Sequence, residues 1–194
     1  MSVKRNPVVL VHGLWNTVNI FWKLRSHLET HGWPIHAPNL TPNNGDVGIE
    51  VLAQQLHAFV EQQLDSHQTF DLLGFSMGGL ISRYYLQRLG GVKRVKRFVT
   101  VSTPHRGSMM AWFRQNTGGI QMRPGSHFLK DLNQDTHQLE RIQVTSLWTP
   151  FDVLVVPASS GRLTVGQSLK LSVASHNKML RATNSLEAIA QSLS

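Results

Sequence analysis

The sequence predicts an α/β fold, with a mostly parallel sheet of about six strands and helices on both faces. Short apolar runs alternate with helix-compatible stretches along the chain. Such alternation requires crossover connections, and crossover connections make the strands parallel. In addition, the segment from Gly74 to Gly78 joins an apolar run to a helix-compatible run within a few residues. Ligands of such sheets bind beyond the carboxyl ends of the strands, so we expect the functional residues there.

The expected strands are short and mostly apolar, as in a buried parallel sheet. In chain order they cover residues 7–11, 34–37, 70–73, 98–101, 142–148 and 169–173. Apolar residues at helical spacing predict helices over residues 21–31, 49–64, 80–89, 126–132 and 185–193. The helix over 49–64 is the clearest, because its apolar stripe lies opposite Gln and Glu side chains. Gly32 ends the first helix, and Gly90 with Gly91 ends the third.

Length and composition bound the domain organisation. The chain has 194 residues, of which 41% are hydrophobic and 15% are charged, which is typical of a globular protein with one sizeable core. We therefore expect residues 1–194 to form a single domain. The chain lacks cysteine, which excludes disulfides and a thiol nucleophile. Residues 108–140 must supply ordinary fold helices, so we expect no large cap over the site.

The basic charge of the chain is compatible with several kinds of binding partner. The formal net charge is +8, and the densest basic cluster is the segment from Lys93 to Arg97. We interpret this cluster as a solvated loop, with peripheral contact to anionic membrane lipids as the alternative. It has no interleaved aromatic residues, so nucleic acid is not an expected partner. The apolar run after the basic N-terminus is too short for a signal peptide or a membrane span, which predicts a cytoplasmic protein.

Ser76 is the candidate nucleophile. The glycines around it relieve backbone crowding and allow a strained turn with an exposed hydroxyl; the alternative is a glycine-rich turn with an incidental serine. In the fold for which such a nucleophile turn is typical, an acid and then a histidine follow the serine along the chain. Of the later carboxylates, Asp152 lies directly beyond a buried strand, and His176 is the one histidine after it. The alternatives are a turn residue for Asp152 and a surface position for His176.

Two backbone N–H groups are candidates to bind the oxyanion of an acyl-transfer reaction. The N–H of Met77 follows the nucleophile directly and lies at a helix N-terminus, where negative charge is favoured. The second N–H is expected from the loop after the first strand, where Gly13 permits a tight turn and Leu14 follows it.

These segments carry a resemblance to a known family: Val9 to Leu14, Gly74 to Gly79, Ser102 to Ser108, and the late Asp152 and His176. They resemble the α/β-hydrolases, and within that superfamily the small bacterial triacylglycerol lipases and related esterases. The resemblance implies the α/β-hydrolase fold and hydrolysis of carboxylic esters through a serine acyl-enzyme, without a cofactor. The chain departs from many of those lipases at Phe75, where they have histidine.

The substrate is expected to be a small-molecule or lipid ester. An apolar segment after the fourth expected strand is a candidate acyl groove, and a core-facing helix is the alternative. The candidate substrate-binding residues are Trp15, Phe75, Met109 and Trp112, with Met110 and Phe113 beside them. His27 and His31 are four residues apart, but no third ligand is identifiable, so we expect no metal site.

Two other functions are compatible with the same residues. A thioesterase or acyltransferase would use the same triad with another acyl donor or acceptor. A non-catalytic protein that binds a lipid or a partner on a hydrolase scaffold is the second alternative.

Overall fold

A computed structural model describes residues 5–194, so Met1 to Lys4 of the basic N-terminus lie outside it. Six strands form one sheet in the order β2-β1-β3-β4-β5-β6, and every neighbouring pair is parallel. The strands are β1 (Val8–Val11), β2 (Ile35–His36), β3 (Phe70–Phe75), β4 (Val95–Val101), β5 (Gln143–Trp148) and β6 (Gln167–Lys170). The predicted parallel sheet is confirmed.

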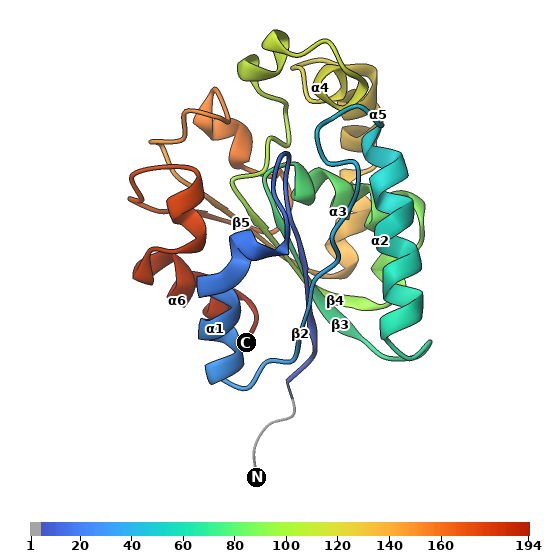
Figure 1. Cartoon of the computed structure of the whole chain (residues 1–194), viewed down its shortest axis with the longest axis vertical. Helices are drawn as coiled ribbons and strands as arrows, with labels where there is room; N and C mark the ends of the chain where they lie inside the picture. The colour runs from blue at the N-terminus through green and yellow to red at the C-terminus, as the bar shows by residue number, and fades with distance from the viewer. Residues whose placement is uncertain (1–4) are drawn as a thin grey trace.

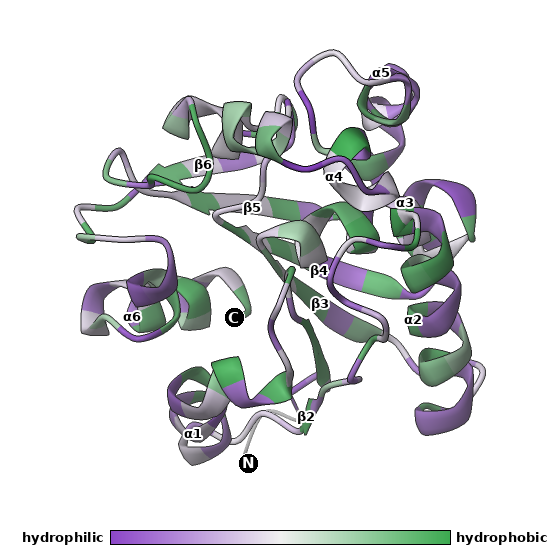
Figure 2. Ribbon diagram, turned by 45° about the horizontal axis from the view of Figure 1, so that its top comes forward, coloured by the Kyte–Doolittle hydropathy of each residue, from purple (hydrophilic) through white to green (hydrophobic). Residues whose placement is uncertain are grey.

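Helices cover both faces of the sheet (Figures 1 and 2). They are α1 (Trp22–Thr30), α2 (Ile49–Gln63), α3 (Met77–Arg88), α4 (Thr117–Gln121), α5 (His127–Gln134) and α6 (Thr183–Ser192). In Figure 2, α1 and α6 lie on one face, and α2 and α3 lie on the other. Each predicted helix has a counterpart, and α4 is an additional short helix within the irregular segment.

Alternating side chains of the strands build a separate apolar layer on each face. In β1, Val8 and Leu10 pack with α1 and α6, whereas Val9 and Val11 pack with α2 and α3. All four side chains are fully buried, and burial of one such side chain contributes about 1.5–3 kcal/mol. Burial on both faces explains why β1 reads as a continuous apolar run.

The last strand differs from its prediction. β6 begins and ends earlier than the expected range of 169–173, and three of its four residues are exposed. It lies at the edge of the sheet, where only one strand neighbour provides burial and hydropathy marks the strand poorly. Val173 is buried beyond the strand, and its carbonyl accepts a hydrogen bond from Thr149 Oγ1 at 2.6 Å.

The basic cluster lies at the amino ends of the strands, whereas Ser76 lies beyond their carboxyl ends. Lys93 and Arg94 precede β4, whose carboxyl end pairs with the end of β3. Arg94 forms an ion pair with Glu61 at 2.6 Å, and Arg97 forms one with the buried Asp71 at 3.3 Å. Two of its cations therefore have internal partners, and the cluster does not border the predicted site. Among the described residues, no helix is long and apolar enough to cross a bilayer.

Candidate active site

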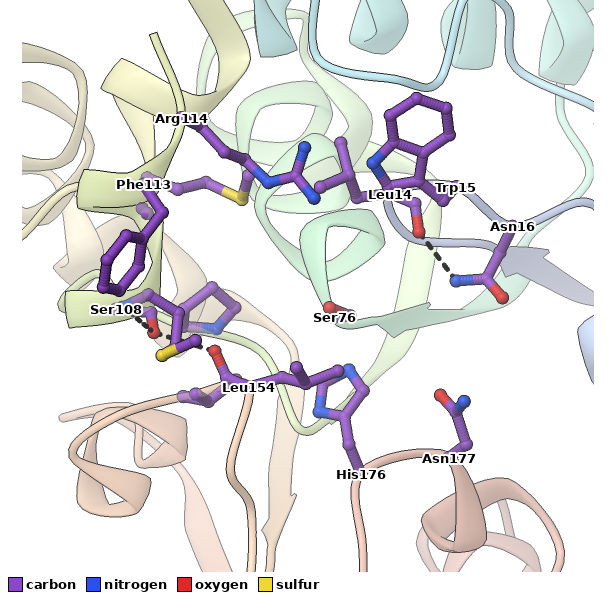
Figure 3. Close-up of a pocket in the computed structure, with 15 residues that line it drawn as sticks. Leu14, Trp15, Asn16, Ser76, Ser108, Phe113, Arg114, Leu154, His176 and Asn177 are labelled. Atoms are coloured by element: carbon purple, nitrogen blue, oxygen red, sulfur yellow. Dashed lines mark hydrogen bonds between the residues drawn. The ribbon is translucent and has the colours of Figure 1, made fainter. Parts of the chain in front are cut away.

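Ser76 occupies a strained turn between β3 and α3. Its φ of 54° lies in the left-handed region, which is costly for a residue with a side chain. The turn is tightly packed, since a Cβ on Gly74 would lie 2.5 Å from the Cα of Gly79. The Ser76 N–H donates to the Val101 carbonyl of β4 at 2.9 Å. Strand, turn and helix together hold the Ser76 side chain at the cavity shown in Figure 3.

Asp152 and His176 form a buried pair beside this turn. Asp152 follows β5, His176 follows β6, and Asp152 Oδ2 accepts a hydrogen bond from His176 Nδ1 at 2.7 Å. Asp152 Oδ1 accepts from the N–H groups of Leu154 and Val155, both at 3.0 Å. The carboxylate therefore has a donor on each oxygen. The proton of the neutral imidazole sits on Nδ1, which leaves the Nε2 lone pair available.

The environment of Asp152 favours its ionised form. Burial acts to raise the pKa of Asp152, but the hydrogen bond and the charge of His176 act against it. The N–H groups of Val155 and Leu154 add to this effect, so the pKa of Asp152 lies below its ordinary value. A carboxylate that is hydrogen-bonded to an imidazole favours the protonated form of that ring.

The Phe75 ring packs against the His176 ring. Its ring centroid lies 4.8 Å from that of His176 at an interplanar angle of 46°, and its side chain is fully buried. Ser76 and His176 line the same cavity (Figure 3). Within residues 5–194 no hydrogen bond joins their side chains, and in unliganded enzymes such bonds are often long.

The loop after β1 lies directly against Ser76. A Cβ on Gly13 would lie 2.8 Å from the Cβ of Ser76 and 3.0 Å from the Phe75 carbonyl, so glycine is required for this approach. Asn16 Nδ2 donates to the Leu14 carbonyl at 2.8 Å and fixes that peptide. Among the described residues, the N–H groups of Leu14 and Met77 have no acceptor. Both are available to a ligand oxygen.

His12 ties this loop to the neighbouring segment after β2. The N–H of Leu40 donates to His12 Nε2 at 3.0 Å, so the ring proton sits on Nδ1, which lies 3.0 Å from the Gly13 carbonyl. Burial lowers the pKa of His12, and the bond to Gly13 opposes this only in part. The neutral ring holds the loop in place.

A cavity of about 660 Å³ brings these groups together (Figure 3). Ser76 and His176 lie in its wall with Leu14. Most of the remaining lining residues are apolar: Trp15, Pro104, Met110, Ala111, Phe113, Met122, Leu154 and Val155. Such a wall accommodates an apolar chain next to the Ser76 hydroxyl.

The comparisons with known proteins identify the family and the fold of the chain. A family model described as the alpha/beta hydrolase fold matches residues 6–125. The chain belongs to this family. The Bacillus licheniformis lipase BlEst2 in its mature form has the same fold as this α/β-hydrolase. The two structures align with a TM-score of 0.81 and 17% sequence identity, over 98% of this chain and 93% of that one. Aspergillus fumigatus lipase B aligns with a TM-score of 0.79 at 18% identity over 94% of this chain and 51% of that one.

Two curated relatives are more similar in sequence. This α/β-hydrolase is 37% identical over 123 residues to a triacylglycerol lipase of Pseudarthrobacter phenanthrenivorans, a match to 59% of this chain and 38% of that protein. A triacylglycerol lipase of Burkholderia plantarii matches to the same extent and with the same identity, over 34% of its length. The match thus spans little more than a third of either relative.

The predicted substrate residues of the α/β-hydrolase separate into two groups. Trp15 lines the cavity, whereas Phe75, Met109 and Trp112 lie outside its lining. The segment 109–113 forms a short 3-10 helix, η3 (Met109–Phe113), in which only Ala111 is buried. The alternative of a core-facing helix is therefore wrong, and its Met110 and Phe113 contribute to the cavity wall instead.

Sequence reasoning missed several cavity residues. Asn16 and Leu154 are close in sequence to predicted site residues, and that proximity was a usable signal. Arg114 carried no such signal, because a lone arginine after an apolar run is ordinary in sequence. Only the fold of residues 108–122 brings its side chain to the cavity.

Proposed function

We propose that this α/β-hydrolase cleaves carboxylic esters through an acyl-enzyme on Ser76. The observation that carries the proposal is the buried hydrogen bond of 2.7 Å between Asp152 and His176, beside a serine with a φ of 54° in one cavity. This combination supplies a nucleophile, a base and a group that orients the base.

The proposed reaction proceeds in two halves. His176 Nε2 takes the Ser76 proton as Oγ attacks the ester carbonyl, and the N–H groups of Leu14 and Met77 bind the oxyanion that forms. When the tetrahedral intermediate collapses, the proton passes from His176 to the departing alcohol, which leaves an acyl-enzyme. Water then gives its proton to His176 and attacks the acyl carbonyl, and His176 returns the proton to Ser76 as the acid leaves. No cofactor is required.

The apolar wall of the cavity favours a substrate ester with an apolar acyl chain. Two apolar residues of this wall are largely exposed, Phe113 to 83% and Trp15 to 64%, so the apolar wall extends to the molecular surface. The names of the relatives, both triacylglycerol lipases, support a lipid-like ester as well. We infer that medium or long acyl esters are the substrates.

Replacement of Ser76 tests the proposal. Ser76→Ala removes the nucleophile, so turnover of p-nitrophenyl octanoate should fall by roughly 10⁵-fold or more while the circular dichroism spectrum stays unchanged. Ser168→Ala, on the exposed edge strand, is the matched control and should retain full activity. An S76A variant with wild-type turnover would exclude the proposal.

A further inference from the structure

We propose that Arg114 selects esters that carry an additional anionic group, a carboxylate or a phosphate, on the acyl or the alcohol part. This inference rests on the proposed function, and it specifies the substrate class of the same cavity. It follows from three features of Arg114, namely its place at the cavity, the way its stem is held, and the absence of a partner for its guanidinium.

Arg114 brings a fixed charge to the cavity. It follows η3, and in Figure 3 its guanidinium reaches over the cavity from the side opposite His176, towards Trp15. The guanidinium carbon lies 5.8 Å from the centroid of the Trp15 ring. Among the described residues that line the cavity, Arg114 is the one with a permanent charge, and none is acidic. An apolar ester gains nothing from a cation at this place.

The stem and the backbone of Arg114 are held in position. A Cβ on Gly119 would lie 2.4 Å from the Cβ of Arg114 and 3.3 Å from its Cδ, so glycine makes room for the arginine stem. Arg123 donates a hydrogen bond from Nη2 to the Arg114 carbonyl. The position from which the guanidinium projects is therefore fixed by its neighbours.

The guanidinium itself is unpaired. Within residues 5–194 it has no carboxylate at ion-pair distance and donates no hydrogen bond to the protein. Asp46, on a nearby loop, accepts hydrogen bonds from Asn44 and Asn116 instead. The neighbouring Arg123 is different, because its guanidinium bonds to the protein and lies 4.7 Å from the Trp112 ring. Arg123 thus stabilises the backbone of this segment, whereas the guanidinium of Arg114 lies at the cavity without a hydrogen-bond partner in the described protein.

The contact with Trp15 does not account for the guanidinium by itself. A cation–π contact at an exposed ring is a weak interaction, and it leaves the N–H donors of the guanidinium unused. The planar fork of donors matches the two oxygens of a carboxylate or a phosphate. The formal net charge of +8 favours the approach of the same class of substrate.

A matched pair of esters tests the proposal. The neutral p-nitrophenyl methyl suberate and the anionic p-nitrophenyl hydrogen suberate have the same acyl chain and leaving group, and they differ in whether the terminal carboxyl group is methylated or free; release of p-nitrophenolate reports cleavage of the aryl ester in both. In a second pair, monooleoylglycerol is compared with its phosphate, oleoyl lysophosphatidic acid, which places the charge on the alcohol part. The wild-type enzyme should favour the anionic member of at least one pair by about tenfold in kcat/KM, mainly through a lower KM. The pair that shows the preference identifies which part of the ester carries the charge.

Variants assign the preference to Arg114. Arg114→Gln should lose the tenfold preference, and Arg114→Lys should keep part of it because the charge remains without the planar fork. Arg141→Gln is the control, since it removes the same charge next to the start of β5, at the opposite edge of the sheet. An unchanged preference in R114Q, or no preference in the wild type, would overturn the proposal.

A binding measurement separates this inference from the proposed function. Titration with octyl phosphate and with octanol, followed by tryptophan fluorescence, reads the same preference without turnover. Absence of hydrolysis of every ester would contradict the proposed function, while the ratio of the two dissociation constants would still decide the role of Arg114. The ratio should favour octyl phosphate by about tenfold in the wild type and fall to near unity in R114Q.

Discussion

At the scale of single residues, Asp152 determines which nitrogen of His176 faces the Ser76 side of the cavity. One carboxylate oxygen accepts from the backbone N–H groups of Leu154 and Val155, and the other accepts from His176 Nδ1. Because each oxygen has its own donor, the carboxylate cannot rotate without losing hydrogen bonds. The ring is held with its free nitrogen in the cavity wall.

Asp152→Asn therefore has a specific expected effect. The backbone donors of Leu154 and Val155 would hold the amide oxygen in the place of Oδ1, which turns the NH₂ group towards His176. The ring would then carry its proton on Nε2, and kcat should fall by roughly 10⁴-fold. The measurement is the turnover of p-nitrophenyl octanoate, with the exposed Asp65→Asn as the control. A loss of less than about tenfold would show that Asp152 does not set the tautomer.

Sequence reasoning predicted the Asp152–His176 pair for a physical reason. Parallel strands place all their carboxyl ends at one edge, so residues 76, 152 and 176 meet there whatever their separation in the chain. The contact of Phe75 with His176 could not be predicted in this way. It depends on which way a strand side chain points relative to a distant loop.

At the scale of elements, the buried Arg83 of α3 joins that helix to the segment after β4. Its guanidinium donates to the Leu132 carbonyl at 2.8 Å, to Asn133 at 2.9 Å and to Thr136 at 3.2 Å. Gln87 accepts a further hydrogen bond from it at 3.0 Å. Burial, and secondarily the charge of Arg88, lower the pKa of Arg83 to about 9. Four hydrogen bonds offset the cost of burying this charge.

Arg83→Met should consequently destabilise the fold. Methionine fills a similar volume but leaves acceptors around Asn133 and Thr136 without their donor, at a cost of about 1–3 kcal/mol. Urea unfolding measures the difference, and hydrogen exchange should report the loss first in residues 127–141. The control is Arg25→Met, which removes an exposed ion pair with Glu29 and should cost less than about 0.5 kcal/mol. Equal stability of R83M and the wild type would contradict the assigned role.

Element boundaries were predictable where burial and periodicity coincide. The stripe of α2 and the buried run of β3 agree with the structure within two residues, because both elements bury a regular set of apolar side chains. The segment 109–113 was ambiguous, since an exposed apolar run has the same letters as a buried one. Its exposure depends on its place at the cavity, which hydropathy does not encode.

At the scale of the whole molecule, buried neutral histidines make the stability of the fold sensitive to acid. Burial lowers the pKa of His105 well below its ordinary value, and the charges of Arg83 and Arg106 add to the effect. His12 is shifted in the same direction. Both rings form hydrogen bonds. His105 Nε2 bonds with Thr100 Oγ1 at 3.0 Å, and His12 Nε2 accepts from the Leu40 N–H at 3.0 Å.

A histidine with a lowered pKa binds fewer protons in the folded state than in the unfolded chain. The free energy of unfolding should therefore fall as the pH drops below about 6.5 and continue to fall until the folded-state pKa is passed. Urea midpoints measured between about pH 8 and pH 5 test this. His105→Gln keeps an amide that can hydrogen-bond Thr100 without titrating and should flatten the curve, whereas the exposed His67→Gln should not. The same slope in H105Q would contradict the assignment.

The arrangement of charge over the whole molecule was less predictable than the fold. Alternating strands and helices define the sheet, and the sheet defines the edge where Ser76 lies. The basic cluster at Lys93 to Arg97 lies at the other edge, and the cation at the cavity is Arg114 instead. The total charge follows from composition. The distribution of charge over the surface depends on the conformations of loops, which the pattern of strands and helices does not predict.

The reactivity of Ser76 is the most direct test of the account. A fluorophosphonate probe reacts with a serine only where a base activates it and an oxyanion site receives the phosphoryl oxygen. Intact-mass and peptide mass spectrometry should find one adduct per chain, located on Ser76, absent in S76A and slowed at least about 10³-fold in His176→Ala. The absence of an adduct in the folded wild-type protein, or an adduct on another serine that persists in S76A, would contradict the account.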